Sequence, residues 1–247
     1  KILLLDIETS PNTAYVWGLW KQNISLSALQ ESSTVLCWAA KWLGEKEVMF
    51  DSVYQSKPEK MAKRIHALIS EADAVVHYNG TKFDIPTLNK EFLLHGMEPP
   101  APYKQIDLLR TMRSQFRFPS NKLDYVADKL GFGNKHETSF QLWIDCMNND
   151  PKAWKQMERY NKHDVILLEK VYKRVLPWIK SHPNHNLHSG EEHVCPNCGG
   201  TKIQRRGTAR TISGSYQRYQ CQDCGTWSRS TKTCLLYTSP SPRDATL

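Results

Sequence analysis

Two carboxylates stand two positions apart at the end of an apolar run near the start of the chain, in the segment LLLDIETS, residues 3–10. Alternate residues of a strand point to the same face, so we expect Asp6 and Glu8 to project together. The apolar surface around them should come from Leu3, Leu5 and Ile7. Adjacent acids repel one another, and protons or a pair of metal cations would relieve that repulsion. The alternative is a strand that simply emerges into solvent, with residues 9–11 forming the turn.

Two further acids occupy positions that can converge with this pair. In HYNGTKFDIPTL, Asp84 follows a buried strand where a helix is expected to begin. On a long amphipathic pattern, Tyr160 and Asp164 are four residues apart and therefore share one helix face. Four acids can hold two Mg²⁺ or Mn²⁺ ions about 4 Å apart, an arrangement that supports phosphodiester hydrolysis. A phenol with a pKa of about 10 could orient the attacking water. Taken alone, Tyr160 could instead be a core aromatic residue and Asp164 a surface acid.

The length and composition of the chain indicate one ordinary domain plus a small module. The 247 residues are 40% apolar, which is enough to build a core. No apolar run approaches the roughly 20 residues of a membrane span, and KILLL at the start is too short for a signal-peptide core. We therefore expect a cytoplasmic protein, in a bacterial or phage-infected cell, that contacts no membrane.

The positive charge is concentrated near the C-terminal end. The formal net charge is +8; residues 1–185 hold 25 Lys and Arg against 21 Asp and Glu, and residues 186–233 hold 7 against 3. Half of the net charge thus lies in a short segment. This favours a polyanionic partner, although a basic solvated face is the alternative.

The order of the predicted elements is typical of an α/β fold. Strands are expected at 13–20, 34–43, 47–53 and 73–79, and helices at 58–72, 85–96, 121–131 and 150–179. A polar stretch without apolar periodicity, SHPNHNLHSGEEH, predicts a linker at 181–193. The expected organisation is a first domain at 1–180, this linker, a small module at 194–233 and a tail at 234–247.

Three motifs in order, DIET (6–9), NGTKFD (79–84) and YNKHD (160–164), make residues 1–180 resemble the DEDD-type 3′-5′ exonucleases, which include proofreading domains of DNA polymerases. The resemblance implies a ribonuclease-H-like fold, a mixed sheet flanked by helices. It implies that the metal ligands are Asp6, Glu8, Asp84 and Asp164. It also implies the tyrosine subclass (DEDDy), because Tyr160 stands four residues before Asp164, whereas the histidine subclass needs a histidine where this chain has Arg159.

For the other notable residues of this region, the interpretation is either open between two roles or purely structural. Asn79 and Phe83 could contact the terminal nucleotide, as the family motif implies, or merely shape the turn after the strand. Asp107 matches no ligand position of the family and is interpreted as structural. Cys37 and Cys146 stand in apolar surroundings and are expected to be small buried residues.

Four cysteines form two C-x-x-C pairs separated by 22 residues: Cys195 with Cys198 and Cys221 with Cys224. Each pair can place two thiolates on one tight turn, and four sulfur ligands suit one Zn²⁺ ion. Two disulfides or an iron centre are the alternatives. The segment resembles a zinc ribbon of the kind found in transposases and transcription factors.

Basic and aromatic residues alternate between the two cysteine pairs. Phosphate pairing by arginine and base stacking by tyrosine together predict a nucleic-acid-binding surface. A solvated hairpin is the competing interpretation, and DNA cannot be distinguished from RNA by these residues. The predicted substrate-binding residues of the ribbon are Arg205, Arg206, Arg210, Tyr216, Arg218 and Tyr219.

The tail CLLYTSPSPRD, residues 234–244, resembles the translation of a transposon-type sequencing adapter. It is therefore interpreted as non-native and excluded from the fold. We expect that the native C-terminus is missing and that little more than an initiator Met is lost at the other end.

The sequence thus predicts a free-standing two-metal 3′-5′ exonuclease, acting on single-stranded 3′ ends of DNA or RNA, with a zinc ribbon that helps to bind the substrate. A polymerase or a replication or recombination protein is a possible partner. Two other classes stay open: a catalytically silent nucleic-acid-binding protein, and an endonuclease or transposase-like enzyme on the same fold.

Overall fold

The computed structural model describes residues 1–133, 138–184, 194–212 and 214–236. The chain divides into two compact units, Lys1–Tyr172 and Lys173–Leu247. Most of the predicted linker and residues 237–247 of the tail lie outside the described residues. Within the described ranges, none of the helices combines the length and the apolar character that crossing a membrane requires.

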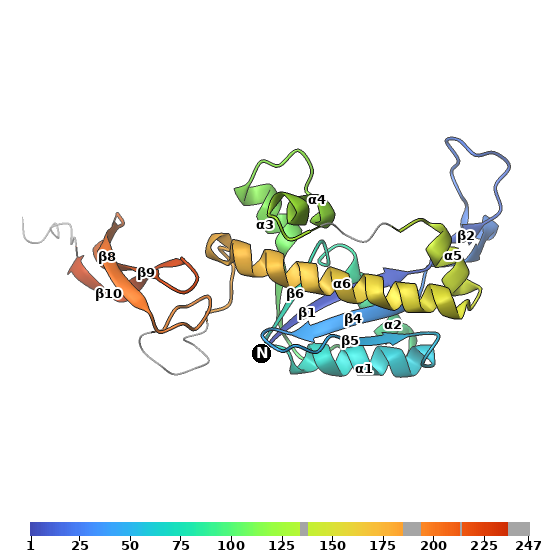
Figure 1. Ribbon diagram of the computed structural model, residues 1–247, viewed down its shortest axis with the longest axis horizontal. Coiled ribbons are helices and arrows are strands. Elements are labelled where there is room, and N and C mark those ends of the chain that lie inside the picture. Colours follow the sequence, from blue (N-terminus) through green and yellow to red (C-terminus); the bar gives the residue numbers. More distant parts are fainter. Residues whose placement is uncertain (134–137, 185–193, 213, 237–247) are drawn as a thin grey trace, which may run out of the picture. The chain divides into compact units, whose positions relative to one another are not determined.

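A five-stranded mixed sheet forms the centre of the first unit (Figure 1). Its strand order is β5-β4-β1-β6-β7. The central strand β1 pairs antiparallel with β4 and parallel with β6, while β5 and β7 occupy the edges. The strands are β1 (Ile2–Thr9), β4 (Val35–Trp42), β5 (Met49–Ser52), β6 (Ala74–His77) and β7 (Lys104–Asp107). The predicted mixed sheet flanked by helices is confirmed.

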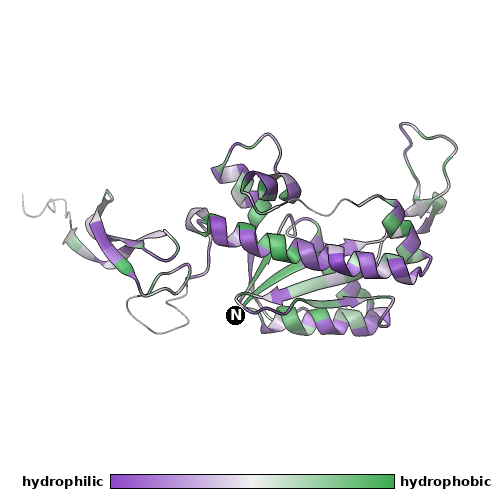
Figure 2. Ribbon diagram, viewed as in Figure 1, coloured by the Kyte–Doolittle hydropathy of each residue, from purple (hydrophilic) through white to green (hydrophobic). Residues whose placement is uncertain are grey.

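The α-helices found in the described residues are α1 (Pro58–Glu71), α2 (Asp84–Leu94), α3 (Leu108–Gln115), α4 (Leu123–Lys129), α5 (Gln141–Met147) and α6 (Pro151–Val175). Short 3-10 helices cover Leu26–Ala28 and Leu176–Trp178. Hydrophilic and hydrophobic residues alternate along α1 and α6 (Figure 2), as expected of helices that bury one side against a sheet. The predicted helices at 58–72, 85–96, 121–131 and 150–179 are found within a few residues of their expected bounds.

The two faces of β1 have different roles. Leu3, Leu5 and Ile7 pack into one hydrophobic core together with α1 and α2 residues such as Ile65 and Leu88. Because side chains alternate along a strand, Asp6 and Glu8 belong to the opposite face. The expectation that these three apolar residues surround the acids is therefore wrong, because they pack in the core on the opposite face of β1.

Helix α6 lies against the face of the sheet that carries the acids. Its residues Met157 and Tyr160 share a buried cluster with Cys37 of β4. Farther along α6, Glu169 forms an ion pair with Lys41 of β4, and both side chains are about nine-tenths buried. Apolar packing and a buried ion pair thus fix α6 on the strands beneath it.

The predicted strand at 13–20 is mostly wrong. Only β2 (Thr13–Ala14) forms there, paired with β3 (Leu29–Glu31). A strand needs a neighbour to satisfy its backbone, and the pairing ends at Ala14. The apolar residues that follow it are exposed, most strongly Trp17, Leu19 and Trp20.

The second unit contains a three-stranded antiparallel sheet in the order β10-β9-β8. The strands are β8 (Ile203–Arg210), β9 (Gly214–Cys221) and β10 (Trp227–Leu236). In β10, Leu235 pairs with Ser215 and Leu236 with Gly214. Backbone pairing with β9 thus continues to Leu236, three residues past the expected end of the ribbon at residue 233.

Candidate active site

Three carboxylates from two elements meet on the α6 face of the sheet. Strand β1 supplies Asp6 and Glu8, and α6 supplies Asp164. One oxygen of each lies within 4.8 Å of the others. Carboxylate oxygens at this spacing fit hard divalent cations, which take several oxygen ligands and neutralise the repulsion between acids. These three residues could hold Mg²⁺ or Mn²⁺.

Asn161 connects the helix to the strand at this point. Its Nδ2 donates a hydrogen bond of 2.7 Å to Oδ2 of Asp6. The Cys37 thiol approaches Oδ1 of Asn161 at 3.8 Å from the other side, and Asn161 is fully buried. The motif YNKHD did not by itself mark Asn161 as part of the site. The available signal was its position three residues before Asp164, which places both on one helix face.

Asp84 has a different environment from the other three acids. It is the first residue of α2, and its Oδ1 accepts a 3.2 Å hydrogen bond from the backbone N–H of Ile7. Burial raises the pKa of Asp84 to about 7; hydrogen bonds from backbone N–H groups oppose this, and the charge of Asp107 adds to it. Asp84 is not one of the carboxylates gathered within 4.8 Å of one another. The structure therefore brings three of the four predicted ligands together and holds the fourth beside β1, at the backbone of Ile7.

Tyr160 lies one helical turn before Asp164 and is 6% exposed. Its ring meets Trp143 of α5 edge to face, with 5.8 Å between centroids. The buried cluster around it includes Cys37, which is the cross-strand partner of Glu8. The ring thus packs in the apolar wall beside the acids.

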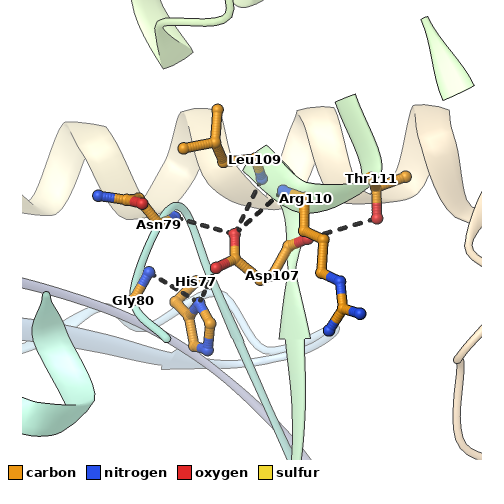
Figure 3. A network of polar contacts seen from close by, with 7 residues as sticks. All are labelled: His77, Asn79, Gly80, Asp107, Leu109, Arg110 and Thr111. Atoms are coloured by element: carbon orange, nitrogen blue, oxygen red, sulfur yellow. Dashed lines mark hydrogen bonds and ion pairs between the residues drawn. The ribbon is translucent and has the colours of Figure 1, made fainter. Parts of the chain in front are cut away.

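The turn between β6 and α2 is held by Asp107 (Figure 3). Oδ1 of Asp107 accepts 3.0 Å hydrogen bonds from the N–H groups of Asn79 and Leu109, so one carboxylate fixes this turn and caps α3. Asn79 has a φ of 71°, a left-handed conformation that asparagine tolerates. The backbone N–H of Gly80 donates to Nδ1 of His77, and a Cβ at Gly80 would lie 2.4 Å from that ring. Only glycine fits there.

Phe83 and Asn79, the two candidate substrate contacts of this turn, differ in how they are held and exposed. Phe83 precedes Asp84 and is 43% exposed, so its ring is accessible to a ligand. The Asn79 side chain points away from the Asp107 network in Figure 3, while its backbone is fixed by that network.

Cys37 and Cys146 are buried, as expected, and burial raises the pKa of both thiols, that of Cys146 to about 12.

The four cysteines of the second unit form another candidate metal site. Their Sγ atoms lie within 4.8 Å of one another, with 3.6 Å between Cys195 and Cys224 and 3.7 Å between Cys198 and Cys221. Sulfur ligands about 2.3 Å from a tetrahedral zinc stand about 3.8 Å apart, whereas disulfide sulfurs are about 2 Å apart. The spacing fits Zn²⁺ and not two disulfides.

Ionisation of all four thiols depends on a bound cation. Burial raises the pKa of Cys195 to about 11 and raises that of Cys198 further. The pKa of Cys224 is lowered although burial opposes this, because hydrogen bonding with Thr226 favours the thiolate. All four sulfurs can be thiolates together only if a metal ion compensates their charge. Gly199 and Gly225 directly follow the two cysteine pairs and have φ of 72° and 80°, left-handed conformations that glycine adopts readily.

The predicted binding residues of the ribbon are distributed over both faces of its sheet. Arg205 is paired with Tyr219, and Arg210 with Ser215. Tyr216 and Arg218 alternate with Tyr219 along β9 and so belong to the other face. Arg205, Arg206, Arg210 and Arg218 are exposed, and Tyr216 and Tyr219 are half-buried.

Two comparisons relate this chain to known proteins. A family model described as RNase_H superfamily matches residues 3–176. Among solved structures, the chain is similar to the family B DNA polymerase from the hyperthermophilic archaeon Pyrobaculum calidifontis, with a TM-score of 0.53 and 17% sequence identity. That similarity covers 86% of this chain and 31% of the polymerase, and at this identity it concerns the fold alone. A comparison with curated proteins gives no match.

Proposed function

Because the chain belongs to the RNase_H superfamily, we propose that it is a metal-dependent 3′-5′ exonuclease of the tyrosine subclass, which hydrolyses phosphodiester bonds at nucleic-acid 3′ ends. The observation that carries this proposal is the meeting of Asp6, Glu8 and Asp164 within 4.8 Å. Tyr160, one turn before Asp164, supports an exonuclease over an endonuclease, because this spacing is that of the exonuclease motif.

The acids would hold two Mg²⁺ or Mn²⁺ ions. Asp6, Glu8 and Asp164 already present oxygens to one point, and Asp84 stands next to β1 through its hydrogen bond with Ile7. When bound, such ions stabilise the negative charge that develops at the scissile phosphate. The pKa of Asp84, which burial raises to about 7, would fall beside a cation, so metal binding would favour its carboxylate form.

The protein's own groups would orient the reacting atoms. Asn161 donates to Oδ2 of Asp6 and so would fix the orientation of this carboxylate toward a ligand. The Tyr160 hydroxyl would donate a hydrogen bond to the attacking water. Phe83, with its exposed ring beside Asp84, would stack on the terminal base, and Asn79 would contact the terminal nucleotide.

The second unit would be a zinc ribbon that binds substrate. Its four sulfurs fit one Zn²⁺ ion, and its arginines suit a polyanion. The two units together would act on single-stranded 3′ ends, either alone or beside a polymerase or a recombination protein.

The test is the digestion of 5′-labelled single-stranded DNA and RNA with Mn²⁺ or Mg²⁺. Wild type is compared with Asp164→Ala and with Asp145→Ala, an acid of α5 that lies outside the carboxylate group. We expect a ladder that shortens from the 3′ end, is absent with Asp164→Ala and persists with Asp145→Ala. No cleavage of any substrate by the wild type, or cleavage of circular strands at the same rate, would overturn the proposal.

A further inference from the structure

Two arginines stand opposite each other on neighbouring strands of the ribbon sheet. Arg218 of β9 and Arg229 of β10 are direct cross-strand partners, so their side chains leave the same face side by side. Both are exposed. Like charges directly opposite each other destabilise a sheet, so this pair lowers the stability of the ribbon unless an anion compensates it.

The carboxylates of the ribbon offer almost no compensating charge. Residues 194–236 contain seven Lys and Arg and one acid, Asp223. That carboxylate lies 3.9 Å from Lys202. An external anion is therefore the natural partner of the arginine pair.

Aromatic rings hold both guanidinium groups in place. The Arg218 guanidinium lies 4.8 Å from the ring centre of Trp227, and that of Arg229 lies 4.4 Å from the ring centre of Tyr216. Each arginine leans toward a ring on the neighbouring strand, two positions away from its direct cross-strand partner. In addition, Nε of Arg218 donates a 2.9 Å hydrogen bond to the backbone oxygen of Arg206. Stacking fixes the plane of a guanidinium and leaves its edge, with the N–H donors, for a ligand.

We propose that Arg218 and Arg229, supported by Trp227 and Tyr216, form a clamp for the phosphodiester backbone of single-stranded nucleic acid. A nucleic-acid backbone lying along this face would accept hydrogen bonds from the two guanidiniums at neighbouring phosphates and would offset their positive charge. Trp227 is 48% exposed and offers an apolar edge to a neighbouring base. This inference rests on the proposed function for its ligand and assigns binding to one face of the ribbon, away from Arg205 and Tyr219.

The experiment measures the affinity of the full chain for fluorescein-labelled single-stranded oligothymidine over a series of salt concentrations. All variants carry Asp164→Ala, so that binding is separated from cleavage. The test variants are Arg218→Gln and Arg229→Gln, and the matched control is Lys232→Gln, which removes the same charge from an exposed position of β10. Zinc content per chain shows that each ribbon is folded.

The clamp predicts that each arginine variant binds about 3- to 10-fold more weakly and lowers the slope of log affinity against log salt by about 0.7. Lys232→Gln should keep both values near those of the parent. Arg218→Lys should keep the slope but lose affinity, because lysine has no planar fork. Equal effects of all three glutamine variants, or parental affinity of Arg218→Lys, would show a diffuse positive surface and overturn the clamp.

The outcomes separate the clamp from the nuclease. If the wild type cleaves no substrate but the two arginine variants lose affinity as stated, the proposed function fails and the clamp stands. If the wild type cleaves and the arginine variants bind like the control, the clamp alone fails.

Discussion

The side-chain amide of Asn161 donates a 2.7 Å hydrogen bond to Oδ2 of Asp6, although 155 positions separate the two residues in the sequence. This contact joins α6, which carries Asp164, to β1, which carries the paired acids. A buried amide that binds one oxygen of a metal-binding carboxylate fixes the direction of the other oxygen. Asn161 is therefore a positioning residue of the candidate site.

Asn161→Ala should lower the affinity for the activating Mn²⁺ by about 10- to 100-fold, because Asp6 loses the partner that orients it. The measurement is activity against Mn²⁺ concentration. The control is Asn148→Ala, an exposed position at the end of α5. An unchanged Mn²⁺ requirement together with a lower melting temperature would assign Asn161 a purely structural role.

The raised pKa of Asp84 predicts a pH-dependent stability without divalent ions. The ordinary pKa is 3.8 and the folded-state value is about 7, so between these values the folded protein keeps a proton that the unfolded chain has released. The proton on Asp84 thus adds up to about 4 kcal/mol to the free energy of unfolding. This stabilisation is fully present below about pH 4 and is lost as the pH rises through about 7.

Urea unfolding in metal-free buffer at a series of pH values tests this. The free energy of unfolding of wild type should fall over that range more steeply than that of Asp84→Asn, whose amide does not titrate. Added Mg²⁺ should reduce the difference, because a cation favours the carboxylate. Parallel curves for the two proteins would contradict a raised pKa.

The buried ion pair between Lys41 and Glu169 should be sensitive to loss of one partner. Lys41→Met removes the cation beside a buried carboxylate and should cost about 3–5 kcal/mol of unfolding free energy. The double variant Lys41→Met/Glu169→Leu should recover most of this loss, because two apolar side chains suit the same space. As a surface control, Lys63→Met in the exposed pair with Glu59 should cost less than about 0.5 kcal/mol. A double variant as unstable as the single one would mean that the pair itself is needed.

Zinc should be required by the ribbon only. Cys198→Ser should abolish the one zinc ion per chain and the amide-exchange protection of β8–β10, because a segment of this size depends on the metal for folding energy. The first unit has its own core and should keep its helical circular dichroism. We expect a higher KM with little change in kcat. Loss of helical signal in this variant would show that the first unit depends on the ribbon.

Local patterns in the sequence predicted much of the site. The strand alternation of Asp6 and Glu8, the helical spacing of Tyr160 and Asp164, and the paired C-x-x-C turns are all relations over a few residues. Each of them depends on backbone geometry that the residues themselves favour.

What the sequence did not predict depends on partners far away in the chain. The Asn161–Asp6 bond joins distant segments, and Asp107 accepts a hydrogen bond from Asn79, which lies 28 positions away in the sequence. The apolar residues after Ala14 have a strand-like composition, but no strand in the described part of the chain pairs with them, and they stay exposed. The composition of a segment sets its preference for the strand conformation, but a strand forms only where another strand lies beside it to pair with its backbone.

Exonuclease activity is tested most directly by comparing a linear 5′-labelled single strand with a circular strand of the same sequence, both incubated with Mn²⁺. We expect stepwise shortening of the linear strand from its 3′ end, an intact circle, and no reaction with Asp164→Ala. Nicking of the circle, or degradation that persists in Asp164→Ala, would contradict a 3′-5′ exonuclease built on Asp6, Glu8 and Asp164.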